Sequence, residues 1–245
     1  MNRPDRRNAL SLEHLRELLD AFREVGESDA IGVVLGGRGS VFSAGHDFAE
    51  LAGAGAEAVR ATLETCTDLV RTIQVIPQPV LARVHGLATA AGFQLVATAD
   101  LAVAGESAGF AAPGGKGGWF CHTPMVAVGR AVSPKRALEL AFTGDPIDAR
   151  TAGEWGIVNR VVPDPDLDGA VLDLLARATR GSVASKGTGK QTFYRQIGLD
   201  PADAYRIAVE AMVASSQTPD AREGMRAFLE KRPPEFGRPE DSTQD

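Results

Sequence analysis

Short apolar runs and amphipathic segments alternate over the first hundred residues, and this alternation constrains the fold more than any other feature. The apolar runs are typical of buried strands, and the segments between them have apolar residues at helical spacing. Strands that alternate with helices form βαβ units in a largely parallel sheet with both faces covered. The predicted strands are 31–35, 41–43, 80–84 and 101–104, and the predicted helices are 12–25, 57–75 and 90–97.

The character of the sequence changes after residue 105. Residues 105–118 are rich in glycine and alanine and predict an extended loop, whereas the chain from 123 onward is mostly helical apart from a short strand at 157–162. We therefore predict an α/β core over residues 1–175 and a helical C-terminal region over 176–245, with a frayed acidic end at 240–245. Four residues are predicted to cap the starts of helices. Ser133, Asp200 and Thr218 each precede a proline at the first helical position, and Ser11 precedes the helix at 12–25.

Charge and cysteine content exclude several functions. The formal net charge of −6 gives no basic footprint for nucleic acid, and no apolar run reaches the roughly 18 residues of a membrane span. The chain has only two cysteines, Cys66 and Cys121, so no disulfide framework is expected. This favours a reducing compartment, and we expect a cytoplasmic location. The four histidines lie far apart without metal-ligand spacing, and no metal site is expected.

Three nucleotide or nucleophile motifs are incomplete. Gly37-Arg38-Gly39 lacks the third glycine of a dinucleotide fingerprint, and the glycine-lysine pairs at 115–116 and 189–190 lack the following serine or threonine of a phosphate loop. Residues 105–109 match G-x-S-x-G around Ser107, but no helix signal follows, and no aspartate or glutamate lies between Ser107 and the only later histidine, His122. A serine hydrolase is thus a disfavoured alternative to a loop of small residues.

Two loops form a stronger constellation. The first, 42–48, follows a strand, and the second, 85–94, runs from a strand into the start of a helix. Backbone N–H groups at a helix start are unpaired and carry partial positive charge. The small side chains at 90–92 let a ligand oxygen approach them, and an N–H from the first loop would complete an oxyanion hole. Removing one such donor typically costs about 2.7–4 kcal/mol of transition-state stabilisation. The alternative is two tight turns with close helix packing.

With their neighbours, these loops resemble the crotonase family of enoyl-CoA hydratases and isomerases. The matching segments run in family order: Asn2 to Leu10, Phe42 to Asp47, Val84 to Leu95, Ala99 to Ala104, Phe142 to Val161 and Glu223 to Arg232. The resemblance implies a crotonase-like α/β spiral of ββα units with a helical C-terminal trimerisation region, hence a homotrimer or hexamer. It also implies an acyl-CoA thioester as substrate, with no separate cofactor because coenzyme A belongs to the substrate.

The resemblance also assigns site residues. The thioester carbonyl would lie between the N–H groups of His46 and Ala91, and the imidazole of His46 would be optional. Phe228 and Lys231 match positions that reach a coenzyme A, either the chain's own or a neighbour's; for Lys231 the alternative is an exposed charge at a helix end. The other implied substrate-binding residues are Arg7, Ala44, Gly45, Asp47, Phe48, Ala90, Gly92 and Gly114.

The sequence departs from the family at the residues that carry acid–base chemistry. Hydratases use two glutamates, and their positions here hold Gln94 and Gly114. Losing such a general acid or base typically lowers the reaction rate by about 10²–10⁴-fold, so efficient hydration is not expected. His122 is the candidate base, with Asp47, Glu50 and Cys121 behind it, and Gln94 could orient water or a carbonyl. The alternative for His122 is a loop residue that caps the helix from 123.

Two functions therefore remain open. One is a lyase or isomerase of fatty acyl-CoA thioesters that stabilises an enolate in the oxyanion hole, and the other is a non-catalytic acyl-CoA-binding or regulatory protein. The start of the chain is also unusual for the family. Relatives carry a strand immediately before the Asn2-Arg3-Pro4 segment, and Met1 stands where that strand should end. Either the chain begins short or it folds without that strand.

Overall fold

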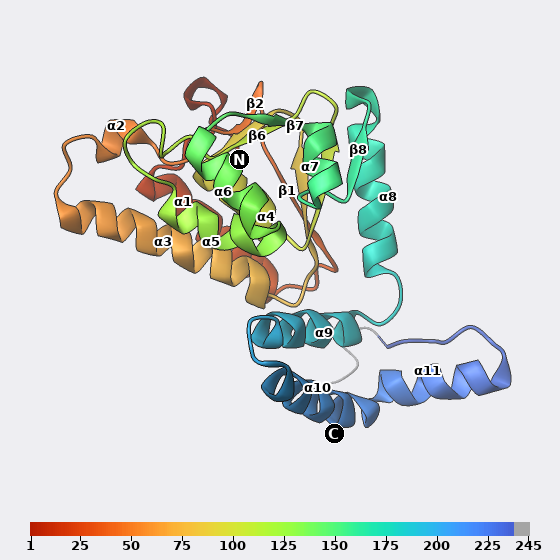
Figure 1. Cartoon of the computed structure of the whole chain (residues 1–245). Helices are drawn as coiled ribbons and strands as arrows, with labels where there is room; N and C mark the ends of the chain where they lie inside the picture. Colours follow the sequence, from red (N-terminus) through yellow and green to blue (C-terminus); the bar gives the residue numbers. More distant parts are fainter. Residues whose placement is uncertain (238–245) are drawn as a thin grey trace.

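The computed structural model describes residues 1–237. An α/β core holds the strands, and three helices near the C-terminus extend below it (Figure 1). In chain order the elements are η1 (Pro4–Arg6), α1 (Leu12–Gly26), β1 (Val33–Gly36), β2 (Val41–Ser43), α2 (Phe48–Leu51), α3 (Ala56–Val75), β3 (Val80–Val84), β4 (Leu87–Thr89), α4 (Ala91–Thr98), β5 (Leu101–Gly105), β6 (Gly109–Ala111), α5 (His122–Ala131), α6 (Pro134–Thr143), β7 (Ile147–Asp148), α7 (Ala149–Trp155), β8 (Arg160–Val162), η2 (Asp164–Asp166), α8 (Leu167–Thr179), α9 (Val183–Gln196), α10 (Pro201–Ser216) and α11 (Pro219–Glu230).

The strands form two four-stranded sheets. The first has the order β1-β3-β5-β8 and is parallel throughout; the second, β2-β4-β6-β7, is parallel except for β6 and β7. Each of β1, β3 and β5 is followed by a short strand of the second sheet and then by helix, which confirms the predicted ββα spiral. The extended loop expected at 105–118 is wrong in part, because Gly109–Ala111 is strand β6. A strand of three residues is too short to show an alternation of apolar and polar side chains, so only its pairing with β4 identifies it.

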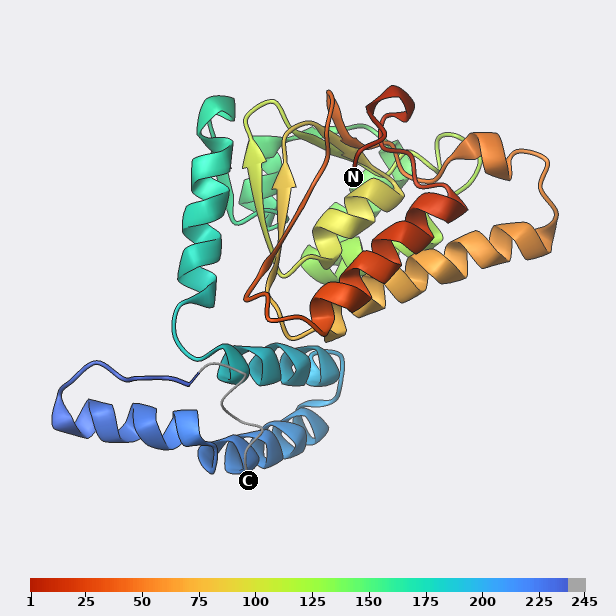
Figure 2. The same cartoon turned by 180° about the vertical axis from the view of Figure 1, so that it is seen from behind.

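The first sheet is covered on both faces, as predicted. Figure 2 shows β-strands between α8 on one side and α4 with α1 on the other. A small apolar cluster joins the sheet to α8 through Leu81, Val103, Leu167 and Val171, and the main core fills the other side. The second sheet pairs β2 with β4, and the candidate site lies beyond the carboxyl ends of these two strands.

Most predicted helix boundaries are confirmed to within about one residue. Helix α3 begins at Ala56 and ends at Val75, and α4 runs over Ala91–Thr98. The prolines after Ser133, Asp200 and Thr218 do begin helices, and the last two of these residues also cap them by side-chain hydrogen bonds. The strand expected at 157–162 is shorter, since only Arg160–Val162 pairs with β5.

A buried ion pair attaches the C-terminal helices to the core. Lys190 of α9 lies 2.7 Å from the Asp100 carboxylate, and its Nζ also donates to the carbonyls of Ile73 and Gln78 at 2.7 and 2.8 Å. The Tyr194 hydroxyl donates to the same carboxylate at 2.9 Å. Burial lowers the pKa of Lys190, while the Asp100 charge opposes that shift. The division at 175/176 stays a prediction, although α8 runs through it, and the tail at 240–245 lies outside the described residues.

Candidate active site

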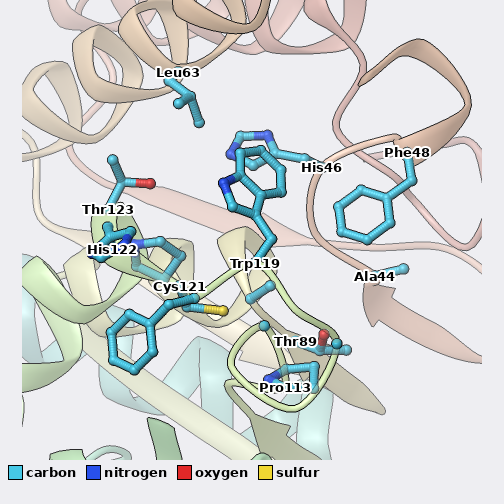
Figure 3. Close-up of a pocket in the computed structure, with 15 residues that line it drawn as sticks. Ala44, His46, Phe48, Leu63, Thr89, Pro113, Trp119, Cys121, His122 and Thr123 are labelled. Carbon is cyan, nitrogen blue, oxygen red and sulfur yellow. The ribbon is translucent and has the colours of Figure 1, made fainter. Parts of the chain in front are cut away.

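A cavity of about 310 Å³ lies where the two loops meet, between helix α3 and the start of α5 (Figure 3). Its wall is mostly apolar, with a few polar groups that point inward, which is the usual composition of a small-molecule site. The lining residues are Ala44, His46, Phe48, Leu63, Thr89, Ala90, Pro113, Gly114, Gly117, Trp119, Phe120, Cys121, His122, Thr123 and Pro124. The two loops singled out in the sequence therefore share one cavity.

Two glycines allow the loops to pack this closely. A Cβ on Gly92 would lie 2.5 Å from the carbonyl oxygen of Ser43 and 2.6 Å from its Cβ, so only glycine lets α4 rest against β2. Gly45 has a φ of 82° and faces the other loop, where its Cβ would lie 3.2 Å from the backbone nitrogen of Ala91. These residues, expected to bind substrate, thus act first as the contact that joins the loops.

The hydrogen bonds of the first loop orient the N–H of His46. Leu10 donates to the Gly45 carbonyl at 2.8 Å and accepts from the Asp47 N–H at 3.2 Å. Because N–H directions alternate along extended backbone, the N–H of His46 points away from Leu10. Ala91 is the first residue of α4, so its N–H has no partner within the helix. Both amides therefore belong to loops in contact, and their convergence on one oxygen stays a prediction.

Ala90 holds a strained conformation at the junction of β4 and α4. Its φ of 50° and ψ of −118° lie in a region that side-chain-bearing residues rarely adopt. Its N–H donates to the Ala111 carbonyl of β6 at 2.9 Å, which keeps the backbone in this turn. Strain of this kind typically costs about 1–3 kcal/mol and is concentrated at functional sites.

The imidazole of His46 forms part of the cavity wall. Burial lowers its pKa, so the ring is neutral at pH 7, and in the described part of the chain neither ring nitrogen has a hydrogen-bond partner. Figure 3 shows the ring behind the indole of Trp119, on the side of the cavity near Leu63. The side chain is thus packed into the site, which its main-chain role alone did not predict.

Gly114, which the resemblance aligns with a hydratase glutamate, has no room for a side chain. A Cβ on Gly114 would clash with the Trp119 carbonyl oxygen and would lie 2.7 Å from the Cys121 sulfur. The loop from 113 to 121 therefore folds over this glycine and fills the space of a larger side chain. Burial raises the pKa of the Cys121 thiol, so it is protonated at neutral pH and cannot serve as the base.

His122 lines the cavity on the opposite side from Phe48 (Figure 3). It is the first residue of α5, and its N–H donates to the Phe120 carbonyl at 2.8 Å while its ring packs on that of Phe120 at 5.0 Å between centroids. The alternative that it caps a helix beginning at 123 is wrong, because the helix includes it. It is exposed to solvent and free to reach a ligand, but its role as base stays a prediction.

Other candidate residues are not brought to the cavity. Gln94 is 3% exposed, its amide oxygen accepts from the Cys66 thiol at 3.9 Å, and it is not part of the cavity wall. Asp47 caps α2 through the Ala49 N–H at 3.1 Å, and Glu50 accepts from the Leu12 N–H at 2.9 Å. Both carboxylates serve local structure here.

Arg7, Phe228 and Lys231, which the resemblance assigns to substrate binding, are also outside the cavity. Arg7 has an exposed side chain, and its carbonyl accepts from the Ala44 N–H at 3.0 Å, which ties the N-terminal segment to the first loop. Phe228 is 82% exposed on α11, and Lys231 follows that helix with a φ of 55°. Figure 1 shows α11 below the core, whereas the cavity lies near α2 and the start of α5, so these two residues do not meet the site within one chain.

Sequence reasoning missed the apolar side of the cavity. Trp119, Leu63 and Thr123 line it, but nothing in their spacing marks them as neighbours. Among residues 1–237, no group of three or more histidine, cysteine, aspartate or glutamate side chains is placed to hold a metal ion. None of the described helices combines the length and apolar character of a membrane span.

Comparison with known proteins gives a consistent result. The sequence model of the enoyl-CoA hydratase/isomerase family matches residues 1–239. A Mus musculus protein named enoyl-CoA hydratase domain-containing protein 3, mitochondrial, is 42% identical over 96% of this chain and 79% of its own length. The crystal structure of an enoyl-CoA hydratase from Mycobacterium smegmatis has a TM-score of 0.92 at 43% identity, over 96% and 92% of the two chains. The crystal structure of human enoyl-CoA hydratase domain-containing protein 3 has a TM-score of 0.91 at 40% identity, over 96% of this chain and 95% of that one.

These comparisons confirm one expectation and correct another. The Trp119–Pro124 stretch and the C-terminal third resemble the type of enoyl-CoA hydratase domain-containing protein 3, and the named relatives bear this out. The cytoplasmic location expected from the cysteine content is wrong by this comparison, because the relatives from mouse, rat, Xenopus laevis and human are all named as mitochondrial. Two buried free cysteines are equally compatible with other reducing compartments.

Proposed function

This chain belongs to the enoyl-CoA hydratase/isomerase family, and on that premise we propose that it binds an acyl-CoA thioester and acts on it as a lyase or isomerase through an enolate. The observation that carries the proposal is the contact between the two loops, in which Gly45 faces the backbone nitrogen of Ala91. Their chain neighbours Ala44, His46 and Ala90 line a mostly apolar cavity beside this contact. The thioester oxygen would accept from the N–H groups of His46 and Ala91. Coenzyme A comes with the substrate, and no separate cofactor is proposed.

In the proposed reaction, the acyl Cα–H bond breaks and the proton passes to a ring nitrogen of His122. The electron pair moves onto the thioester oxygen, where the two amides stabilise the developing charge. In a β,γ-unsaturated thioester the dienolate takes the proton back at Cγ, so that the double bond moves to Cα–Cβ and the isomerisation is complete. In a β-substituted thioester the enolate collapses to a Cα–Cβ double bond, and the substituent leaves with its bonding electron pair and takes the proton from His122. No aspartate or glutamate is among the residues that line the cavity, but two histidines are, His46 and His122. We assign the base to His122 because its ring is exposed to solvent and can exchange its proton there, whereas the ring of His46 is half-buried behind Trp119.

The same absence of carboxylates favours a second candidate, a non-catalytic acyl-CoA-binding protein. Hydration requires a positioned water and a proton donor, and the Gly114 position has no room for the family's second glutamate. The cavity and both amide-bearing loops are nevertheless present, so binding is expected under either function.

One pair of measurements separates the two. Hydration of crotonyl-CoA and exchange of the acyl Cα proton with deuterated solvent are measured beside binding of an unreactive acyl-CoA thioether. Tight binding without exchange or turnover supports the binding protein. Exchange that is lost in His122→Ala with binding retained supports the enzyme. Exchange unaffected by His122→Ala contradicts the assignment of His122 as base, and failure to bind any acyl-CoA refutes the proposal.

We also propose that the C-terminal helices assemble a homotrimer or hexamer. Helix α10 buries none of its residues, and its apolar side chains Tyr205, Val209, Met212 and Val213 are exposed along one face. An apolar stripe of this kind marks an interaction surface. Assembly would bring Phe228 and Lys231 of one chain toward the coenzyme A of another. The mass in solution, measured by light scattering, tests it, and a monomer at micromolar concentration would contradict it.

A further inference from the structure

A second cavity adjoins the candidate site. It has a volume of about 340 Å³ and lies between α2 and the start of α3, with a wall formed by Phe48, Leu51, Ala52, Val59 and Trp119. Every one of these side chains is apolar. Phe48 and Trp119 also line the first cavity, and they are the two residues that the cavities share. The two aromatic side chains therefore stand between the cavities.

The two rings contact each other at the surface of the protein. Their centroids are 6.0 Å apart with the planes inclined at 44°, and Figure 3 shows the indole and the phenyl ring side by side at the cavity. Phe48 is 63% exposed and Trp119 is 42% exposed, so neither is part of the main core. The pair separates the cavities without holding the fold together.

The loop that carries Trp119 is held by hydrogen bonds of its own backbone: the Gly117 N–H donates to the Pro113 carbonyl at 3.0 Å, and the Gly114 carbonyl accepts at 2.8 Å from the N–H of Trp119. Gly117 and Gly118 precede it, and Gly118 has a φ of 88° with no atom within 4 Å of the place of a Cβ. Residues 115–119 are exposed to solvent. The backbone of the loop thus places the indole between the cavities, and removing the indole would join them into one apolar channel.

We propose that Phe48 and Trp119 form a partition that ends the acyl pocket and sets the length of acyl chain that the protein accepts. This inference rests on the proposed binding of acyl-CoA. With the partition in place, the first cavity takes a short acyl group. The apolar second cavity receives the rest of a longer chain only when the indole is removed or displaced.

The test is a binding series with unreactive thioethers of coenzyme A that carry saturated chains of 4, 6, 8, 10 and 12 carbons. Each added methylene that is buried strengthens binding by about fourfold. In the wild type the increase stops where the chain reaches the partition. In Trp119→Ala it continues for several further methylenes, whereas Trp119→Phe keeps an aromatic ring there and shows a smaller extension. Leu138→Ala, which removes an apolar side chain of similar exposure (47%) outside both cavities, leaves the profile unchanged.

Each outcome bears on a separate statement. A limit that moves to longer chains in Trp119→Ala supports the partition. Identical length profiles in the wild type and Trp119→Ala, with both proteins binding acyl-CoA, overturn the partition but leave the proposed function standing. Absence of binding at every length in the folded wild type refutes the proposed function and the partition together. If Trp119→Ala fails to fold by its thermal melt, Phe48→Ala tests the other half of the partition with the same series.

Discussion

Replacing Gly92 by alanine tests the contact on which the site is built. The new Cβ would lie 2.5–2.8 Å from three atoms of Ser43, one of which is the backbone carbonyl oxygen, so the start of α4 must move away from β2. Overpacking of this kind costs about 1–3 kcal/mol of folding free energy. For a protein of this size that corresponds to a melting temperature lower by about 2–12 °C.

The same movement carries the Ala91 N–H away from the first loop. If this amide is an oxyanion donor, its displacement makes the turnover number of Gly92→Ala about 10²–10³-fold lower than that of the wild type, which is the effect of losing one such donor. Binding of an unreactive acyl-CoA thioether is expected to weaken as well. Thermal unfolding and calorimetric titration of the same preparations measure the two effects separately.

Gly129→Ala is the matched control. Gly129 lies within α5, and no atom is within 4 Å of the place of its Cβ, so alanine gains helix propensity without a clash. Stability is expected to rise by about 0.5–1 kcal/mol with binding unchanged. If Gly92→Ala melts and binds like the wild type, the reasoning that places these loops in obligatory contact is refuted.

Three further changes have expected outcomes. Ala90→Gly relieves the φ of 50° and should raise the free energy of unfolding by about 1 kcal/mol in urea denaturation, net of the entropy of glycine; a loss of stability would show that no strain is stored there. Lys190→Met leaves the Asp100 carboxylate buried and unpaired and should cost about 3–5 kcal/mol, with a smaller loss when Asp100→Asn is added; additive losses would contradict the pairing. Hydrogen bonds from Arg232 lower the pKa of Glu223 from 4.5 to about 2, so its contribution is complete above pH 4.5 and is lost as pH falls toward 2; acid unfolding curves should show this loss in the wild type and lack it in Glu223→Gln.

The long elements of this fold could be predicted because their signals are local. Helix α1 has apolar residues at helical spacing, and Ser11 before it accepts a hydrogen bond from the His14 N–H at 3.1 Å. Helix α3 ends before two prolines, where a helix cannot continue. In contrast, β6 has three residues and is defined by its pairing with β4, a contact that no period within residues 109–111 encodes.

The site was predicted in part for the same reason. The glycines and small residues of the two loops mark places where the backbone must approach closely, and the structure places Gly92 against Ser43 and Gly45 against Ala91. Gln94 and Asp47 were assigned by their position relative to family motifs. The direction of a side chain depends on what packs around it, and the structure turns Gln94 toward Cys66 and Asp47 toward the start of α2.

The sequence by itself determined the family, the order of the longer helices and of strands β1, β2, β3 and β5, and the two loops that carry backbone amides. The tertiary structure alone decided that Trp119 and Phe48 lie together, that the loop after Pro113 closes over Gly114, and that α11 stays apart from the cavity. The physical reason is range. Periodicity, capping and steric limits at glycine act over a few residues of chain, whereas the space left around a side chain depends on atoms contributed by segments far apart in the sequence.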